Sequence, residues 1–496
     1  MNEFSSQLPS ILDQIIASIP VFKPELVIIV AFIGTILATL FFDTIWKHSS
    51  LAVAFLGIIA SIMVTIPQID NPTSGFFGML IIDNFAVYAR VIIQLALLVV
   101  LFLIQQYFKN KTFGKNLGDI YTILLAAGLG LNLLTVTTNW LLAFIAIETV
   151  SISSYILVGY FSETKRQAEA AMKYVLFGSV CAAIMLYGLS LLYGFTGNLD
   201  FASQAHIQGL ISAPPVMISI ALLFMFVGIG FKLGFVPFHM WTPDVYEGAP
   251  TPITSFLSTV PKIGAIVLLS RIFQAWVSTS FYFSELTLLF IVVVAIVTML
   301  VGNLIALRQT DVKRMMAYSS IGHTGFLLMA VISTQTKDPQ ILLFYLAVYT
   351  LMNIAVFAFI QTLEEKIGST TIADYAGLGK TYPILFTIFT FVGISLIGLP
   401  PTAGFIGKLL VFSATFDLYQ TTQDIPFLLL LIVGALTSVI SLFYYFRIPL
   451  YAFLRKGDET QNPPIPLTLT YGIGIIFGFL VLLFGIFPDL LLQVFN

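Results

Sequence analysis

Long apolar segments recur along almost the whole 496-residue chain, and they constrain its fold more than any other feature. A transmembrane helix needs about 20 mostly apolar residues. Hydropathy predicts about fourteen such spans, at residues 24–43, 50–67, 84–107, 119–137, 139–160, 170–194, 215–239, 253–273, 285–306, 318–334, 339–361, 382–416, 426–446 and 466–488. With 58% hydrophobic and 9% charged residues, the chain has too little polar surface for a soluble globule of this length. We therefore predict an all-α membrane protein.

Composition also restricts the chemistry of the chain. A net charge of -2 argues against a nucleic-acid partner. The single cysteine, Cys181, excludes a disulfide within the chain, an iron–sulfur cluster and a cysteine zinc site. The histidines show no metal-binding spacing such as HExxH; they are His48, His206, His239 and His323. We expect neither a metal nor a redox cofactor in this chain.

Lysine and arginine are distributed unevenly between the two sets of connections. Those after odd-numbered spans carry fourteen, namely Lys47, Lys109, Lys111, Lys115, Lys165, Arg166, Arg308, Lys313, Arg314, Lys366, Lys380, Arg447, Arg455 and Lys456. The other side carries three, Lys23, Arg271 and Lys337. The positive-inside rule then places the basic connections in the cytoplasm or its equivalent, with both termini outside. Residues 1–20 lack the features of a secretory signal and are expected to remain as a short interfacial helix.

Two spans contain residues that break helices. The seventh leads into FKLGFVPFHMWTPDVYEGAPTP, which is rich in proline and glycine, and the twelfth contains Pro400–Pro401. Proline removes a backbone donor and clashes with the preceding turn. We predict that both helices are discontinuous, and discontinuous helices near the bilayer midplane are common ion-binding elements of transporters.

The two predicted breaks suggest an internal repeat. They lie five spans apart, and each has a lysine nearby, Lys232 and Lys408. Because five is odd, the second copy would be inverted. We predict inverted five-helix repeats in spans 4–8 and 9–13, at residues 119–273 and 285–446, between an N-terminal three-helix region, 1–118, and a C-terminal segment, 447–496. Ordinary proline kinks are the alternative.

Three lysines, Lys232, Lys262 and Lys408, lie well inside apolar segments. A charge at mid-bilayer costs roughly 2.5–3.5 kcal/mol, and such residues usually mark ion or proton pathways. Glu148, in NWLLAFIAIETVSISSY, is the best candidate counter-ion for Lys232. If the pair separated, the lysine would tend to release its proton, so helix motion could become charge motion. A purely structural buried ion pair is the alternative.

Further ionisable residues allow two interpretations each. Lys173 follows the charged loop SETKRQAE and either snorkels to the interface or belongs to the buried set. His323, in YSSIGHTGF, is either a proton relay or a packing residue. Asp83 and Arg90 are seven residues apart, so they share a helix face and are predicted to pair.

Together these motifs resemble a known family. FKLGFVPFHMWTPDVYEGAPTP, KRMMAYSSIGHTGF and GLPPTAGFIGK, with Glu148 and Lys173 before them, resemble the antiporter-like membrane subunits of respiratory complex I over about residues 80 to 450. Three features favour the subunit N type, called subunit 2 in mitochondria: no long lateral helix follows the last span, Lys408 stands where subunit M typically has glutamate, and AAMKYVLFGS resembles the subunit N form. Thr149 departs from the usual leucine.

The resemblance implies a proton-translocating subunit of NADH-quinone oxidoreductase. It implies that Glu148 and Lys232 form a modulating ion pair, with Lys173 as its accessory. It implies that Lys262 is the central relay and that His323 belongs to the connecting polar axis. Lys408 would be the terminal proton-loading residue toward the outside. It implies that flavin, iron–sulfur clusters and quinone are bound by partner subunits, and that the neighbours are an adjacent antiporter-like subunit, small helical subunits and lipids. The expected location is the bacterial inner membrane or, alternatively, an organellar inner or thylakoid membrane.

Other functions remain open at this stage. A subunit of a multi-subunit Na⁺/H⁺ antiporter, or the equivalent subunit of a ferredoxin-linked photosynthetic complex, would share the charged residues on the same spans. A lipid-linked sugar flippase would need a large cationic cavity rather than single lysines. A structural scaffold would tolerate replacement of Lys232 or Glu148.

Overall fold

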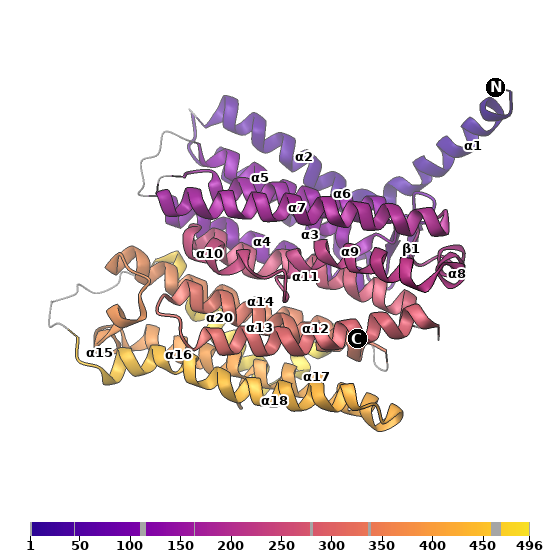
Figure 1. Ribbon diagram of the computed structural model, residues 1–496. Coiled ribbons are helices and arrows are strands. Elements are labelled where there is room, and N and C mark those ends of the chain that lie inside the picture. The colour runs from indigo at the N-terminus through magenta and orange to yellow at the C-terminus, as the bar shows by residue number, and fades with distance from the viewer. Residues whose placement is uncertain are drawn as a thin grey trace.

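The computed structural model describes residues 2–43, 45–109, 116–162, 164–277, 281–335, 339–457 and 468–495. Most of these residues lie in helices that run side by side (Figure 1). The α-helices are α1 (Asn2–Ser18), α2 (Lys23–Leu37), α3 (Ser49–Thr65), α4 (Asn84–Phe108), α5 (Leu117–Val136), α6 (Trp140–Gly159), α7 (Lys165–Thr196), α8 (Gln204–Ser212), α9 (Pro215–Leu233), α10 (Trp241–Gly248), α11 (Thr251–Val277), α12 (Tyr282–Ala306), α13 (Val312–Ser333), α14 (Gln340–Ile367), α15 (Leu378–Thr381), α16 (Pro383–Ile397), α17 (Ala403–Thr422), α18 (Ile425–Tyr445), α19 (Arg447–Pro449), α20 (Leu469–Ile486) and α21 (Asp489–Leu492).

The remaining elements are short. Strands β1 (Thr73–Gly75) and β2 (Leu80–Ile82) form an antiparallel pair between α3 and α4. Single helical turns of 3₁₀ or π type are η1 (Ile19–Phe22), η2 (Ala38–Phe42), η3 (Ile66–Gln68), η4 (Ile372–Tyr375) and η5 (Leu450–Leu454).

The described part of the chain contains 13 helices long and apolar enough to cross a membrane. They correspond to thirteen of the predicted spans. The remaining span, the predicted 382–416, is divided between α16, a shorter apolar helix, and α17. The prediction of an all-α membrane protein with about fourteen spans is therefore confirmed.

The connections gather at two opposite ends of the bundle according to span number. At one end Asp311 bridges Thr371, and the amide of Gly377 donates to the carbonyl of Tyr451, so connections after odd-numbered spans meet. We call this the basic end; Figure 1 shows α10 and α15 there, on the left. At the opposite end Asn139 bridges Asp200, and Figure 1 shows α8 and β1 there, near both termini. This grouping is the one that alternating spans predict, whereas the side of the membrane each end faces stays a prediction.

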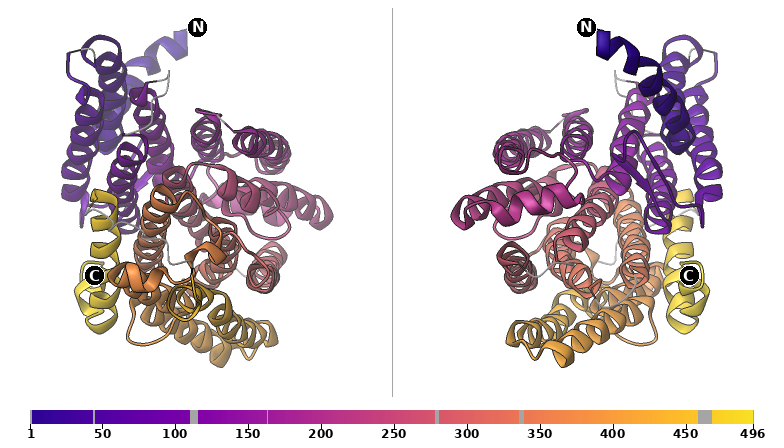
Figure 2. Two further views of the ribbon diagram at one scale, coloured as in Figure 1. Left: turned by 90° about the vertical axis from the view of Figure 1, so that its left-hand side faces the viewer. Right: turned by 90° about the vertical axis from the view of Figure 1, so that its right-hand side faces the viewer.

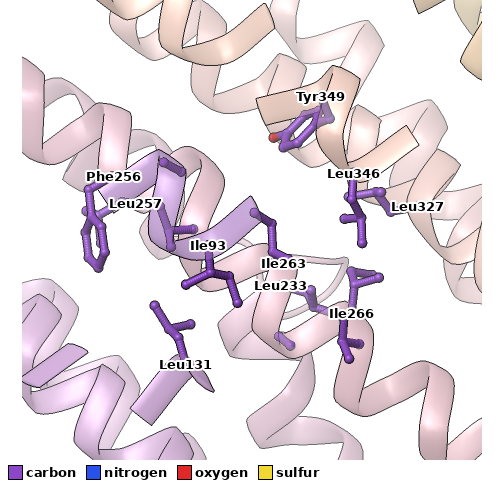
Figure 3. Packing of buried hydrophobic residues seen from close by; sticks show 14 of the residues in the cluster. Ile93, Leu131, Leu233, Phe256, Leu257, Ile263, Ile266, Leu327, Leu346 and Tyr349 are labelled. Carbon is purple, nitrogen blue, oxygen red and sulfur yellow. The ribbon is translucent and has the colours of Figure 1, made fainter. Parts of the chain in front are cut away.

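Helix α11 lies at the centre of the bundle. All its residues from Thr251 to Ser270 are buried. Figure 3 shows apolar side chains of α4, α5, α9, α13 and α14 around it, including Ile93, Leu131 and Leu327. Because neighbouring helices surround α11, a lysine in its middle faces protein rather than lipid, which is where intramembrane charges are usually found.

Both predicted helix breaks are present, and they start in the same way. Helix α9 ends at Gly234, with a φ of 67°, and α16 ends at Gly398, with a φ of 89°. Each glycine amide donates to carbonyls three and four residues back, and the next amide donates five residues back. This left-handed C-cap suits glycine because a side chain would be strained there. The matched caps favour the predicted inverted repeats, although the repeat boundaries stay a prediction.

The predicted pairing of Asp83 with Arg90 is wrong. Asp83 caps α4 by accepting from the amide of Ala86, and it receives two bonds, of 2.6 and 3.0 Å, from the guanidinium of Arg271. Arg90 instead pairs with Glu25 at 3.2 Å, and both side chains are fully buried. Asp83 precedes the first turn of α4, so its side chain turns back over the helix start and not along the face that carries Arg90.

The C-terminal segment packs against the N-terminal part of the bundle. Figure 2 shows α20 beside the N-terminal helices in both views. The Tyr88 ring on α4 makes an edge contact with Phe495, with 5.3 Å between ring centroids. Helix α1, predicted as an interfacial helix, extends away from the bundle (Figure 1).

Close packing of α12 against α13 provides a test of the fold. A Cβ added to Gly302 would lie 2.4 Å from the backbone nitrogen of Gly322 and 2.8 Å from the carbonyl of Tyr318. Backbone atoms cannot turn aside, so we expect Gly302→Ala to destabilise the protein by about 1–3 kcal/mol. The measurement is thermal unfolding of the purified protein in detergent.

The matched control is Gly472→Ala on α20, where an added Cβ would meet no atom within 4 Å. We expect this change to leave the unfolding temperature unchanged or slightly raised, because alanine is a better helix former than glycine. Equal unfolding temperatures for the two variants would contradict the packing described for α12 and α13.

Candidate functional site

Lys232 lies in the last turn of α9, just before the first helix break, and is 3% exposed. Its Nζ donates to Ser151 Oγ on α6, at 3.1 Å. Glu148 is one turn earlier on α6, half-buried, and attracts the lysine electrostatically. In the described part of the chain, no salt bridge with a nitrogen–oxygen distance of 4.0 Å or less joins Glu148 to Lys232. The hydroxyl of Ser151 is therefore the direct contact of this amine.

Lys262 is held by α13. Its Nζ donates to the carbonyl of Ser320 at 2.7 Å and to Thr324 Oγ1 at 2.8 Å. Thr324 Oγ1 is also 3.0 Å from the carbonyl of Leu233, the last residue of α9. Lys262 is 2% exposed, and its direct partners are neutral oxygen atoms. The central lysine is thus linked through one hydroxyl to the first helix break.

Lys408 uses the second break directly. Its Nζ donates to the carbonyl of Ile397 at 2.7 Å and to that of Leu396 at 3.2 Å, at the end of α16. The last carbonyls of a helix have no partner within the helix and carry the negative end of its dipole. The amine also lies 4.4 Å from the centre of the Phe326 ring, a favourable cation–π position. Backbone and aromatic electrons, rather than a carboxylate, hold this charge.

His323 is buried on α13, next to Thr324. One ring nitrogen lies 3.0 Å from the hydroxyl of Tyr345 on α14. Both Lys262 and Lys408 are close enough to act on the ring electrostatically. The structure therefore brings the two lysines and the histidine into one polar region, as the sequence predicts.

Hydroxyl groups around this region were not predicted from sequence. Ser320 Oγ lies 2.9 Å from the hydroxyl of Tyr349 and 3.4 Å from that of Tyr246. Tyr349 also donates to the carbonyl of Ser258 on α11, at 3.0 Å. Serine and tyrosine occur in many cores, so composition does not single them out. The available signal was spacing, because Ser320 and Thr324 are one turn apart and share a helix face.

Lys173 takes part in a salt-bridge network at the basic end. Its Nζ lies 2.7 Å from carboxylates of both Glu169 and Asp244. Asp244 also accepts from Arg314 at 2.7 Å, and Arg314 contacts Glu247 at 2.8 Å. The network joins α7, α10 and α13. The salt bridges of Lys173 are thus with these carboxylates and not with Glu148, and its side chain is 41% exposed.

The network shifts the titration of Asp244. Burial would raise the pKa of Asp244, but hydrogen bonds from Lys173 and Arg314 outweigh it and hold the pKa below its usual value. A carboxylate with a lowered pKa stabilises the folded state above its ordinary pKa and loses this effect as the pH falls through the lowered value. The network therefore stabilises the folded state at neutral pH.

Lys313 was counted among the basic residues of the connections, and this assignment is wrong. Hydropathy predicts it in the connection before the tenth span, but it lies in the first turn of α13 and is 4% exposed. Its Nζ donates to the carbonyl of Ala249 at 2.6 Å, between α10 and α11. The helix begins earlier than hydropathy suggests, since the charged first turn lowers the apolar average.

In the described part of the chain, no three His, Cys, Asp or Glu side chains gather as a metal site would require.

Comparison with known proteins identifies similar chains. Residues 137–441 match the family described as "NADH:quinone oxidoreductase/Mrp antiporter, TM". The chain is 40% identical over 421 residues to "NADH-quinone oxidoreductase subunit N 2" of Chloroherpeton thalassium, covering 83% of this chain and 81% of that one. It is 37% identical over 440 residues to "NAD(P)H-quinone oxidoreductase subunit 2" of Prochlorococcus marinus, covering 88% and 84%.

The fold also has a solved counterpart. A chain in the structure of respiratory complex I from Thermus thermophilus superposes with a TM-score of 0.76 at 28% identity. The match covers 95% of this chain and 98% of that chain, so nearly the whole of each chain is compared.

The Asp244 network gives a prediction with a defined pH dependence. We expect Asp244→Asn to lower the free energy of unfolding by roughly 1–2 kcal/mol at neutral pH, a value reduced because Lys173 and Arg314 are partly exposed to solvent. The difference from the parent should disappear at a pH below the lowered pKa of Asp244, where the parent loses the same charge. Thermal unfolding across the pH range measures both.

The control is Asp424→Asn, an exposed carboxylate before α18 at the opposite end. It should leave the unfolding temperature within error at every pH. A deficit in Asp244→Asn that persisted at acid pH would show that the charge of Asp244 is not the cause.

Proposed function

Because this chain belongs to the family of NADH-quinone oxidoreductase subunit N, within the broader NADH:quinone oxidoreductase/Mrp antiporter membrane subunits, we propose that its buried lysines carry protons across the membrane. It is a proton-pumping subunit of the membrane arm of respiratory complex I, a multi-pass protein that works with other subunits. The proposal concerns the residues that do this work.

The observation that carries the proposal is the way the three lysines are held. Each amine of Lys232, Lys262 and Lys408 is almost fully buried and bonds directly to hydroxyls or backbone carbonyls. A carboxylate in direct contact would keep the amine permanently charged. Neutral oxygens stabilise the charge less, so modest changes in hydration or in a nearby charge can switch the amine between its two protonation states.

The proposed roles are those that the resemblance to the family implies. Glu148 and Lys232 form the modulating pair, which is open in this structure because Ser151 takes the amine. Lys262 is the central relay and His323 connects it to Lys408, the group that loads protons for release. Lys173 is an accessory that links α7, which packs against the helices of the pair, to α10. These assignments are supported by burial and contact, and variants must test each one.

Electron transfer belongs to other subunits in this proposal. Flavin, iron–sulfur clusters and quinone would be bound by partner chains, whose conformational or electrostatic signal reaches this chain. The adjacent antiporter-like subunit and small helical subunits would cover its lateral faces, together with lipids. Apolar side chains exposed beside Glu148, such as Ile145 and Ile152, fit such a neighbour.

A second candidate is favoured by the names of some relatives. Similarity to "NAD(P)H-quinone oxidoreductase subunit 2" of Prochlorococcus marinus supports the equivalent subunit of a photosynthetic complex in a thylakoid membrane. The family description also names Mrp antiporters, for which Na⁺ would be a transported ion. Purification of the complex with its electron-input subunits, and pumping assays with and without Na⁺, separate these candidates from the bacterial inner-membrane complex.

Replacement of the central lysine tests the proposal. We expect Lys262→Ala to reduce proton pumping and coupled quinone reduction by roughly 10²-fold or more, because general acid–base groups contribute factors of that size. The measurement uses the assembled complex in liposomes, with a pH-sensitive dye for pumping and absorbance for quinone reduction. Lys380→Ala, an exposed lysine on α15, is the control and should be silent. Normal pumping by Lys262→Ala would refute the proposed function.

Orientation gives a separate prediction. Cys181 is the only cysteine in the sequence, so a Cys181→Ser background permits single-cysteine labelling. We propose that the basic end faces the cytoplasm and that both termini face outside. A membrane-impermeant thiol reagent should label Asn71→Cys in intact cells and label Lys380→Cys only after permeabilisation; both native residues are exposed. Mass spectrometry of this chain's peptides reads the result, and the reverse pattern would overturn the orientation.

A further inference from the structure

A polar cavity of about 310 Å³ opens at the basic end, where the connections after odd-numbered spans meet. We call it the basic-end cavity. Its lining includes charged side chains from four separate helices, which are Arg166, Glu247, Lys313 and Glu364. The cavity lies at the start of α11, the helix that carries Lys262.

Glu364 joins the cavity to α11. It lines the cavity from the last turns of α14 and is partly exposed. Its Oε2 accepts a hydrogen bond from Thr251 Oγ1, and its Oε1 lies 3.5 Å from the hydroxyl of Tyr107 on α4. Thr251 is the first residue of α11 and is fully buried. One carboxylate therefore touches both the cavity and the buried interior.

A stripe of hydroxyls continues from this carboxylate toward Lys262. Thr251, Ser255 and Ser258 precede Lys262 at spacings of four, three and four residues, so all four lie on one face of α11. They are all buried, and the stripe is about 16 Å long by helix rise. Neighbours on a helix face have Cβ atoms about 5–6 Å apart, a gap that one water molecule bridges.

Ser255 is the member of the stripe whose environment needs explaining. Its Oγ is fully buried and has no hydrogen-bond partner among the described residues. Leaving a buried hydroxyl without a partner costs about 1–3 kcal/mol, so such groups usually bind water. Near the inner end of the stripe, Tyr349 donates to the carbonyl of Ser258 and contacts Ser320, whose carbonyl binds Lys262. Polar groups thus occur at every helical turn from the cavity to the amine.

We propose that Glu364 collects protons for Lys262 from the basic-end cavity, and that Thr251 and Ser255 relay them. This proposal rests on the proposed proton transfer through Lys262. A proton from water binds the Glu364 carboxylate and passes to the Thr251 oxygen while the hydroxyl proton of Thr251 moves on toward Ser255. The last transfer converts the neutral Lys262 amine to ammonium and leaves Glu364 ionised again, so one positive charge moves inward.

Charged and polar groups from several helices surround Glu364. Lys313 on α13 and Arg166 on α7 bring positive charge to the same cavity, and Glu247 on α10 brings negative charge. Tyr107 on α4 bonds the carboxylate, and Tyr375 on η4 is close enough to interact electrostatically. The Glu364 carboxylate therefore has both positive and negative neighbours, and the cavity exposes it to water on one side.

The test replaces Glu364 by glutamine in the assembled complex. Proton pumping and coupled quinone reduction are measured in liposomes while the pH on the basic-end side is varied. We expect Glu364→Gln to slow both by roughly tenfold at alkaline pH, with a smaller loss at acid pH, where water supplies protons more readily. A small weak acid such as formate, added on that side, should restore the rate because it carries protons into the cavity.

The matched control is the neighbouring carboxylate. Glu365 accepts from Gln361 Nε2 at 2.9 Å, and Glu365→Gln should keep the parent rate and pH profile. A second variant, Ser255→Ala, removes a relay hydroxyl without changing charge and should slow pumping without rescue by formate, since the block lies beyond the cavity.

The outcomes separate this proposal from the proposed function. A Glu364→Gln complex with the parent's rate and pH profile overturns the proposal, as does a defect that neither acid pH nor formate relieves. If Lys262→Ala abolishes pumping while Glu364→Gln is silent, protons reach Lys262 by another route and the proposed function stands. If Lys262→Ala itself pumps normally, the proposed function fails regardless of Glu364.

Discussion

The arrangement of this protein depends on keeping amines inside the membrane without a carboxylate beside them. An isolated ammonium group in a dry interior is costly, and a closed ion pair would remove the cost by fixing the charge permanently. Lys262 and Lys408 are neither isolated nor in a closed ion pair, because carbonyl and hydroxyl oxygens accept hydrogen bonds from their amines. Such partners accept a hydrogen bond from either the charged or the neutral amine. The proton can therefore leave without the site collapsing, which a relay requires.

The second helix break supplies the carbonyls that hold Lys408, whereas Lys262 is held by a carbonyl and a hydroxyl of the continuous helix α13. In a continuous helix the carbonyls already accept hydrogen bonds within the helix, so a helix end offers an amine more free acceptors. Ending α16 at Gly398 frees the carbonyls that bind Lys408, and ending α9 at Gly234 leaves the Leu233 carbonyl near Thr324. Irregular backbone at this depth is tolerated where protein covers it, and Gly234 at the first break is buried. Each helix break thus lies beside a buried lysine, Lys232 in the last turn before the first break and Lys408 bonded to the carbonyls of the second.

Local features of this kind could be predicted from the sequence, whereas partners could not. Spans, breaks and buried lysines follow from hydropathy, proline and glycine, which act over a few residues. The partner of Asp83 is Arg271, 188 residues away, and no spacing rule reaches that far. Glu148, the predicted counter-ion, acts on Lys232 electrostatically, whereas the hydroxyl of Ser151, three residues later on α6, bonds the amine directly. A charge pair is visible in a sequence, while a serine in contact with an amine resembles any other serine.

Helix α13 explains how distant parts of the chain can act together. Near its start Arg314 bonds Asp244 and Glu247 on α10, and Asp244 in turn bonds Lys173 on α7. Further along, the same helix presents Ser320 and Thr324 to Lys262, with His323 beside them. The exposed part of this network contributes only about 0–1 kcal/mol per pair, so it can rearrange easily. A helix shift in response to charges near α7 would move the oxygens that hold Lys262. Because amine hydrogen bonds weaken steeply with distance and angle, a displacement well under one helical turn is enough to change the proton affinity of the central lysine.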